Sequence, residues 1–178
     1  INYREAYNLF ACNGILFNHD SPVRGETFVT KKIVNALCRI KLGYQKKLYL
    51  GNLEAKRDWG HAEDFVEAMW MMLQKKTPSD YVIATGKQYS VRDFVNKVLN
   101  ELNIKFQWIG KGLKSKCYNI EGKCIIECDK KYFRPLEVDK LCGDAKKAFK
   151  ELKWKPRKNI NKLIEEMVNS ELDLIKND

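Results

Sequence analysis

Hydrophobic positions along the chain follow two spacings, and each spacing predicts a different kind of element. A spacing of three or four residues, as through Phe65, Ala68, Met69 and Met72, predicts amphipathic helices. These helices are expected at residues 2–12, 27–42, 62–73, 90–102, 144–152 and 160–175. Short apolar runs bounded by turn residues are typical of buried parallel strands. They lie at residues 15–17, 48–52, 81–86 and 105–109.

Strands that alternate with helices indicate an α/β protein with a parallel sheet component. Ser90, with Asp93 three residues later, approximates a capping box and marks the start of one helix. Residues 111–131 lack clear periodicity, so no regular element is predicted there. There is no internal repeat and no linker composition, which favours one compact unit. Because the chain begins inside a predicted helix, we expect part of the sheet to lie upstream.

Composition narrows the classes of partner. Hydrophobic residues make up 44% of the 178 residues, enough for a core, and the formal net charge is +10. A positive net charge favours anionic ligands but gives no information about the fold. No apolar run approaches the roughly 18–20 residues that a membrane-spanning helix needs. A basic nucleic-acid surface over 111–131 is conceivable, but no recognition motif is present and a solvated face explains these charges better.

The six cysteines show no Cys-x-x-Cys pair, and both histidines lie far in sequence from the cluster at Cys117, Cys124 and Cys128. Reduced thiols are therefore the preferred interpretation, ahead of a disulfide scaffold. A metal site built from Cys117, Cys124 and Cys128 is kept only as a minor alternative, and no metal is expected.

No motif in this chain is sufficient for catalysis by itself. It has no glycine-rich dinucleotide or phosphate loop, no nucleophile elbow and no zinc-protease helix. Instead, cations lie beside turns and helix starts, where arginine forks and free backbone N–H groups suit phosphate oxygens. For each cation alone, a solvated surface charge is the favoured interpretation. His19 follows a strand end, where α/β proteins place ligands, although a loop histidine without a ligand fits the pattern equally well. His61 is interpreted as a capping or packing residue.

Read together, several segments closely resemble the GDP-mannose 4,6-dehydratase family. The most specific are Arg-Asp-Trp-Gly-His at 57–61 and Asn-His at 18–19. The resembling segments are 2–10, 13–19, 21–25, 28–30 with Lys32, 51–53, 55–62, 84–86, 132–135, 137–139 and 154–156. They follow the family's order over nearly the whole chain.

The resemblance implies the C-terminal part of a Rossmann-like NAD(P)-binding fold plus the smaller α/β substrate-binding domain. Residues 1–178 would form the C-terminal half, mainly the nucleotide-sugar-binding domain, without the N-terminal NADP-binding half. In the family, a tyrosine–lysine pair with a threonine and a glutamate does the chemistry. The matching segment lies upstream of Ile1, so no catalytic residue is assigned in this chain.

Binding residues carry over by position. His19 and Arg24 match family positions that contact NADP, and Asn18 matches an asparagine that contacts substrate. Lys32, Arg57 and Arg134 match cations around the GDP pyrophosphate, and Glu137 matches a carboxylate that holds GDP hydroxyls. Two residues depart from the family pattern: Val23 stands where a second arginine is usual, and Lys31 replaces an arginine. Residues 111–128 match poorly, and no role is carried over there.

The resemblance therefore implies conversion of GDP-mannose to GDP-4-keto-6-deoxymannose in GDP-fucose biosynthesis, with bound NADP as a hydride shuttle. The enzyme would be a cytoplasmic lyase and a dimer or tetramer, and this chain alone would be inactive. A related nucleotide-sugar epimerase or reductase is the first alternative. A non-catalytic nucleic-acid-binding module is a distant second.

Overall fold

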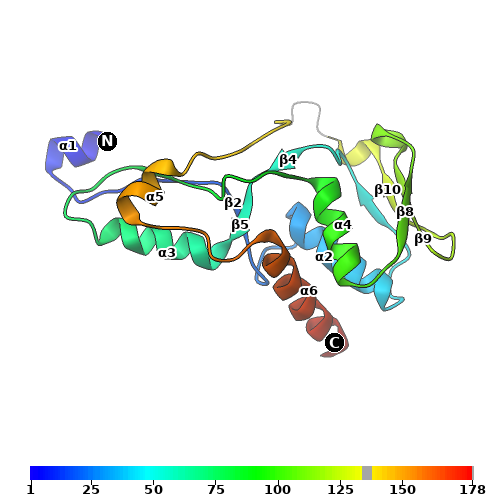
Figure 1. Ribbon diagram of the computed structural model, residues 1–178. Helices are drawn as coiled ribbons and strands as arrows, with labels where there is room; N and C mark the ends of the chain where they lie inside the picture. Colours follow the sequence, from blue (N-terminus) through cyan, green and yellow to red (C-terminus); the bar gives the residue numbers. More distant parts are fainter. Residues whose placement is uncertain (134–137, 178) are drawn as a thin grey trace.

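The computed structural model describes residues 1–133 and 138–177, which form an elongated molecule with two lobes (Figure 1). The helices are α1 (Asn2–Tyr7), α2 (Val29–Lys41), α3 (Ala62–Leu73), α4 (Val91–Glu101), α5 (Lys146–Leu152) and α6 (Ile160–Asn177), with short 3-10 turns η1 (Gly112–Lys114) and η2 (Lys130–Tyr132). The strands are β1 (Gly14–Leu16), β2 (Asn18–Asp20), β3 (Leu48–Leu50), β4 (Lys56–Arg57), β5 (Trp59–His61), β6 (Tyr81–Ile83), β7 (Tyr89–Ser90), β8 (Phe106–Ile109), β9 (Lys116–Asn119) and β10 (Cys124–Cys128).

The first lobe is a two-stranded parallel sheet flanked by helices. Strands β1 and β6 pair with Ile15 opposite Val82, α5 packs against β6, and α3 packs against α5. Its core is built from large buried side chains, including Phe65, Tyr81 and Trp154. This is the alternation of strand and helix that the periodicity predicts, and the ends of α3 coincide with the predicted 62–73.

The second lobe is a four-stranded sheet with helices α2 and α4 beside it, and α6 packs on these two helices (Figure 1). Its strand order is β3-β10-β9-β8, in which β3 and β10 are parallel and the other pairs antiparallel. Leu37, Phe94 and Leu163 bring the three helices into one core with Ile126 of the sheet. The buried hydrophobic residues form two clusters, one in each lobe.

Residues 111–131 are regular, contrary to the sequence prediction. They hold η1, β9 and β10, and the β9–β10 turn is closed by Asn119, whose Oδ1 accepts from the backbone of Glu121 and Lys123. Buried Cys117 and Ile126 face each other across the pair, while charged neighbours stay at the surface. The strands are short and the buried positions irregular, so no sequence period reveals them.

Helix α1 is shorter than predicted. It ends at Tyr7 because Asn8 adopts the left-handed conformation with φ 51°. The capping box of α4 is confirmed, since Ser90 accepts from the Asp93 amide and the Asp93 carboxylate accepts from the Ser90 amide. All six cysteines are free, as their spacing indicates.

Candidate functional site

A pocket of about 530 Å³ opens between β2, the start of α2 and the segment from β3 to β5, and we call it the substrate-side pocket. Asn18 of β2, Lys32 of α2 and Arg57 of β4 all line it. These residues are 14 and 25 positions apart in sequence, yet they face one cavity. The structure therefore brings together the three predicted substrate residues that it describes.

A second hollow of about 410 Å³, the cofactor-side pocket, adjoins the first. It is lined by His19 and Arg24, the two residues predicted to contact the cofactor. Asn18 lines both pockets, so β2 forms the boundary between them. Parallel strand ends are the usual place for ligands in α/β proteins, and β2 pairs in parallel with β5.

Local contacts hold His19 and Arg24 in place. The Nδ1 of His19 lies 2.8 Å from the Phe17 carbonyl oxygen, which can only accept, so Nδ1 carries the hydrogen. The ring stacks on Phe65 with centroids 4.7 Å apart. Arg24 pairs with Asp20 at 2.8 Å, and its guanidinium lies 3.5 Å from the Phe28 ring centroid. An imidazole and a guanidinium fit an anionic nucleotide cofactor.

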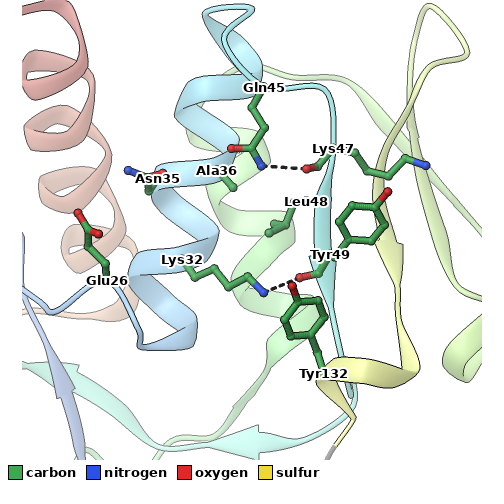
Figure 2. A pocket seen from close by; sticks show the side chains of 9 residues that line it. All are labelled: Glu26, Lys32, Asn35, Ala36, Gln45, Lys47, Leu48, Tyr49 and Tyr132. Atoms are coloured by element: carbon green, nitrogen blue, oxygen red, sulfur yellow. Dashed lines mark hydrogen bonds between the residues drawn. The ribbon is translucent and has the colours of Figure 1, made fainter. Parts of the chain in front are cut away.

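Lys32 reaches from α2 across to β3 (Figure 2). Its ammonium donates to the Tyr49 carbonyl oxygen at 2.8 Å and lies 3.7 Å from the Tyr132 ring centroid. Burial lowers its pKa, because the charged form loses water. Lys32 and Tyr132 also line a smaller hollow of about 290 Å³ beside the substrate-side pocket. An anion bound in the pocket would favour the charged form of Lys32, which burial disfavours.

Arg57 is held by the chain segment that precedes α5. Its Nη1 donates to the carbonyl oxygens of Lys56 at 2.8 Å and Val138 at 2.6 Å. The backbone of Lys56 also bonds to Asp139 and Leu141. These bonds join β4 to the segment after residue 137. The predicted binding residues Arg134 and Glu137 lie outside the described residues.

Asp58 is a residue of this site that the sequence reasoning missed. Its fully buried carboxylate accepts from the Thr85 amide (2.9 Å), the Thr85 hydroxyl (2.6 Å) and the amides of Gly86 (2.9 Å) and Gly143 (3.3 Å). The block at 57–61 therefore combines a pocket-lining arginine with an internal anchor. The only signal for Asp58 in the sequence is its place in the family-specific block at 57–61.

His61 has the structural role that its sequence position predicts. Its Nδ1 accepts from the Glu63 amide and caps α3, while Nε2 lies 2.9 Å from Glu166. In the described part of the chain, His61, Glu63 and Glu166 form the only cluster with metal-ligand spacing. The ammonium of Lys158 bonds to both carboxylates at 2.8 and 2.9 Å, so the cluster already contains its own cation.

The two departures from the family pattern lie in different surroundings. Val23 is 91% exposed. Lys31 is buried and pairs with Glu171 of α6 at 2.5 Å, so it contributes to packing of α2 on α6.

Gly51 lies against the backbone of Tyr132, the residue that covers Lys32. A Cβ at position 51 would stand 2.0 Å from the Tyr132 carbonyl oxygen, so one backbone segment would have to move. We expect Gly51→Ala to lower the free energy of unfolding by about 1–3 kcal/mol, as measured by urea denaturation. Gly25→Ala is the matched control, since its Cβ would meet only Phe28 carbons at 3.6 Å. Equal stability of the two variants would contradict the prediction.

The fold of the chain is similar to that of several solved structures. The chain superposes on the structure of RMD from Pseudomonas aeruginosa complexed with NADPH, with a TM-score of 0.80 and 16% identity, over 97% of this chain and 52% of that one. It also superposes on dTDP-glucose 4,6-dehydratase from Bacillus anthracis in complex with NAD, with a TM-score of 0.72 and 20% identity, over 95% and 47%. The chain thus has the fold of part of an NAD(P)-binding short-chain dehydrogenase/reductase, as predicted.

The sequence then specifies the family. The profile described as GDP-mannose 4,6 dehydratase matches residues 1–167. A GDP-mannose 4,6 dehydratase of Dictyostelium discoideum is 52% identical over 99% of this chain and 50% of its own length. The chain belongs to the GDP-mannose 4,6-dehydratase family. It spans about half the length of the curated relatives it matches. Among the described residues, no helix combines the length and apolarity needed to cross a membrane.

Proposed function

We propose that this chain supplies the GDP-mannose-binding part of a GDP-mannose 4,6-dehydratase that works with NADP. The observation that carries the proposal is the meeting of Asn18, Lys32 and Arg57 in one pocket. A diphosphate carries several negative charges and needs converging cations, which Lys32 and Arg57 provide from different elements. Arg134 and Glu137 are proposed to complete the GDP site from the adjoining segment.

The cofactor-side pocket supports the second half of the proposal. His19 and Arg24 would hold NADP, which supplies reversible hydride exchange when bound. Asn18, on the boundary, would orient the sugar toward that pocket. The described residues provide binding and orientation, so the acid–base chemistry is proposed to reside in an upstream half that also contains the glycine-rich loop.

The remaining parts of the proposal concern context. We propose that residues 1–178 form the C-terminal half of the enzyme, with the second lobe as most of the substrate domain. The complete enzyme would be a cytoplasmic dimer or tetramer in GDP-fucose biosynthesis, and this half alone would be inactive. Family membership and the fold support these assignments.

Calorimetric titration of the chain with GDP-mannose, with GDP as competitor and a polynucleotide as control, is the first test. Saturable binding that GDP competes away supports the proposal. Tight, salt-sensitive binding of polynucleotide without GDP-mannose binding would favour a nucleic-acid module instead.

The activity is tested in a chimera in which these 178 residues replace the matching half of the Dictyostelium relative. We expect it to convert GDP-mannose to a 4-keto-6-deoxy sugar in the presence of NADP. A product epimerised or reduced without loss of water would place the chain with the epimerases or reductases. A folded chimera that neither binds nor converts GDP-mannose would refute the proposal.

A further inference from the structure

Asp20, at the end of β2, lines neither pocket and is not among the residues predicted to bind either ligand. Its side chain is 2% exposed. Its neighbours in sequence, Asn18 and His19, line the substrate-side and cofactor-side pockets. The contacts of this buried carboxylate show which groups it holds in place.

The Asp20 carboxylate contacts two groups, the guanidinium of Arg24 and the hydroxyl of Thr30. Its Oδ1 pairs with Arg24 Nε at 2.8 Å, and Arg24 lines the cofactor-side pocket. The same oxygen accepts from the Thr30 hydroxyl at 3.0 Å. Thr30 lies in the first turn of α2, two residues before Lys32, which lines the substrate-side pocket.

Phe28 is a second link between Arg24 and the substrate-side pocket. Its ring lies under the Arg24 guanidinium at 3.5 Å and also lines the substrate-side pocket. A change in the position of Arg24 therefore alters the wall of the neighbouring pocket. Asp20, Arg24, Phe28 and Thr30 form one contiguous cluster, which we call the boundary cluster.

The buried carboxylate is costly to the fold. Burial raises the pKa of Asp20 above its usual value, although Arg24 and Thr30 act in the opposite direction. A carboxyl whose pKa is higher in the folded than in the unfolded state favours folding at low pH. That contribution is lost as the pH rises through the folded pKa. At neutral pH, burial of the charge therefore works against folding, and the ion pair with Arg24 offsets part of that cost.

We propose that Asp20 is a positioning residue that orients Arg24 toward the cofactor and the first turn of α2 toward the substrate. This inference rests on the proposed function, because it takes NADPH and GDP-mannose as the two ligands. The amide of Asp20→Asn keeps an oxygen for the Thr30 hydroxyl but loses the charge that pairs with Arg24. Thr30→Val removes the contact on the α2 side alone.

The test uses the chimera and its Asp20→Asn, Thr30→Val and Asp173→Asn variants. Asp173 lies exposed on α6 and serves as the matched control. We expect Asp20→Asn to weaken both NADPH and GDP-mannose roughly tenfold, as expected for loss of a charge-assisted contact. Thr30→Val should weaken GDP-mannose more than NADPH, and Asp173→Asn should change neither.

Two further readouts separate positioning from simple stabilisation. Hydrogen exchange measured by mass spectrometry should be faster in peptides covering residues 21–32 of Asp20→Asn and unchanged in those covering α6. The urea midpoint should be the same or higher. Unchanged affinity for either ligand, or a lower midpoint with unchanged exchange at 21–32, would overturn the inference. If the parent chimera binds neither ligand, the proposed function fails, and exchange at 21–32 alone still decides the positioning role.

Discussion

Arg57→Ala is expected to weaken GDP-mannose binding by about 1.5–3 kcal/mol, or roughly 10- to 100-fold. Arg57 lines the substrate-side pocket beside Lys32, and a guanidinium that bonds to phosphate oxygens contributes in the ground state and the transition state alike. Loss of such uniform binding raises the Michaelis constant more than it lowers turnover. The measurement is steady-state kinetics of the chimera together with calorimetric affinity for GDP-mannose.

Arg39→Ala is the matched control, because Arg39 is an exposed arginine in the last turn of α2. It should leave both constants unchanged. Arg134→Ala is expected to behave as Arg57→Ala does, since both residues match family cations around the pyrophosphate. Unchanged substrate affinity in both the Arg57 and the Arg134 variant would defeat the assignment of these residues.

Asp58→Ala is expected to have the largest effect on stability, lowering the free energy of unfolding by about 3 kcal/mol or more. The substitution leaves four donors near residues 85, 86 and 143 without their buried acceptor. The Gly143 amide then lies buried without an acceptor, which is the costly state for a polar group, and the less buried donors of Thr85 and Gly86 lose a charged acceptor. Urea denaturation of the variant and of the parent chain measures the difference.

Asp144→Ala is the control for Asp58→Ala, because Asp144 is an exposed aspartate on the neighbouring segment. Its effect on unfolding should be small. Because Asp58 adjoins Arg57, the Asp58 variant should also weaken GDP-mannose binding wherever it remains folded. A stability within about 0.5 kcal/mol of the parent chain would show that the network around Asp58 is dispensable.

Long periodic elements could be predicted from the sequence, whereas short strands could not. The apolar period of α3 and the capping residues of α4 are local signals, and the structure confirms both. Strands β4 and β7 contain two residues each and exist because Lys56 and Arg57 pair with Ser90 and Tyr89. Such strands are defined by partners distant in sequence, so no local pattern reveals them.

Some residues of the candidate site could be predicted from the sequence, and others could not. The resemblance to the family identifies Arg57 and Lys32, whereas their residue types alone favour a solvated surface charge. Asp20 and Asp58 escaped notice because a lone aspartate gives no periodic signal. What distinguishes them is burial, 2% and 0% exposure, together with donors from other segments.

The sequence by itself determined the α/β class, the main helices and the family. These rest on local spacing and on ordered motifs that survive without knowledge of contacts. Only the tertiary structure decided that Asn18, Lys32 and Arg57 share one pocket, that Asn18 also lines a second, and that the Asp20 carboxylate contacts both Arg24 and Thr30. The physical reason is that a pocket is a relation between segments distant in sequence, and tertiary packing of those segments sets that relation.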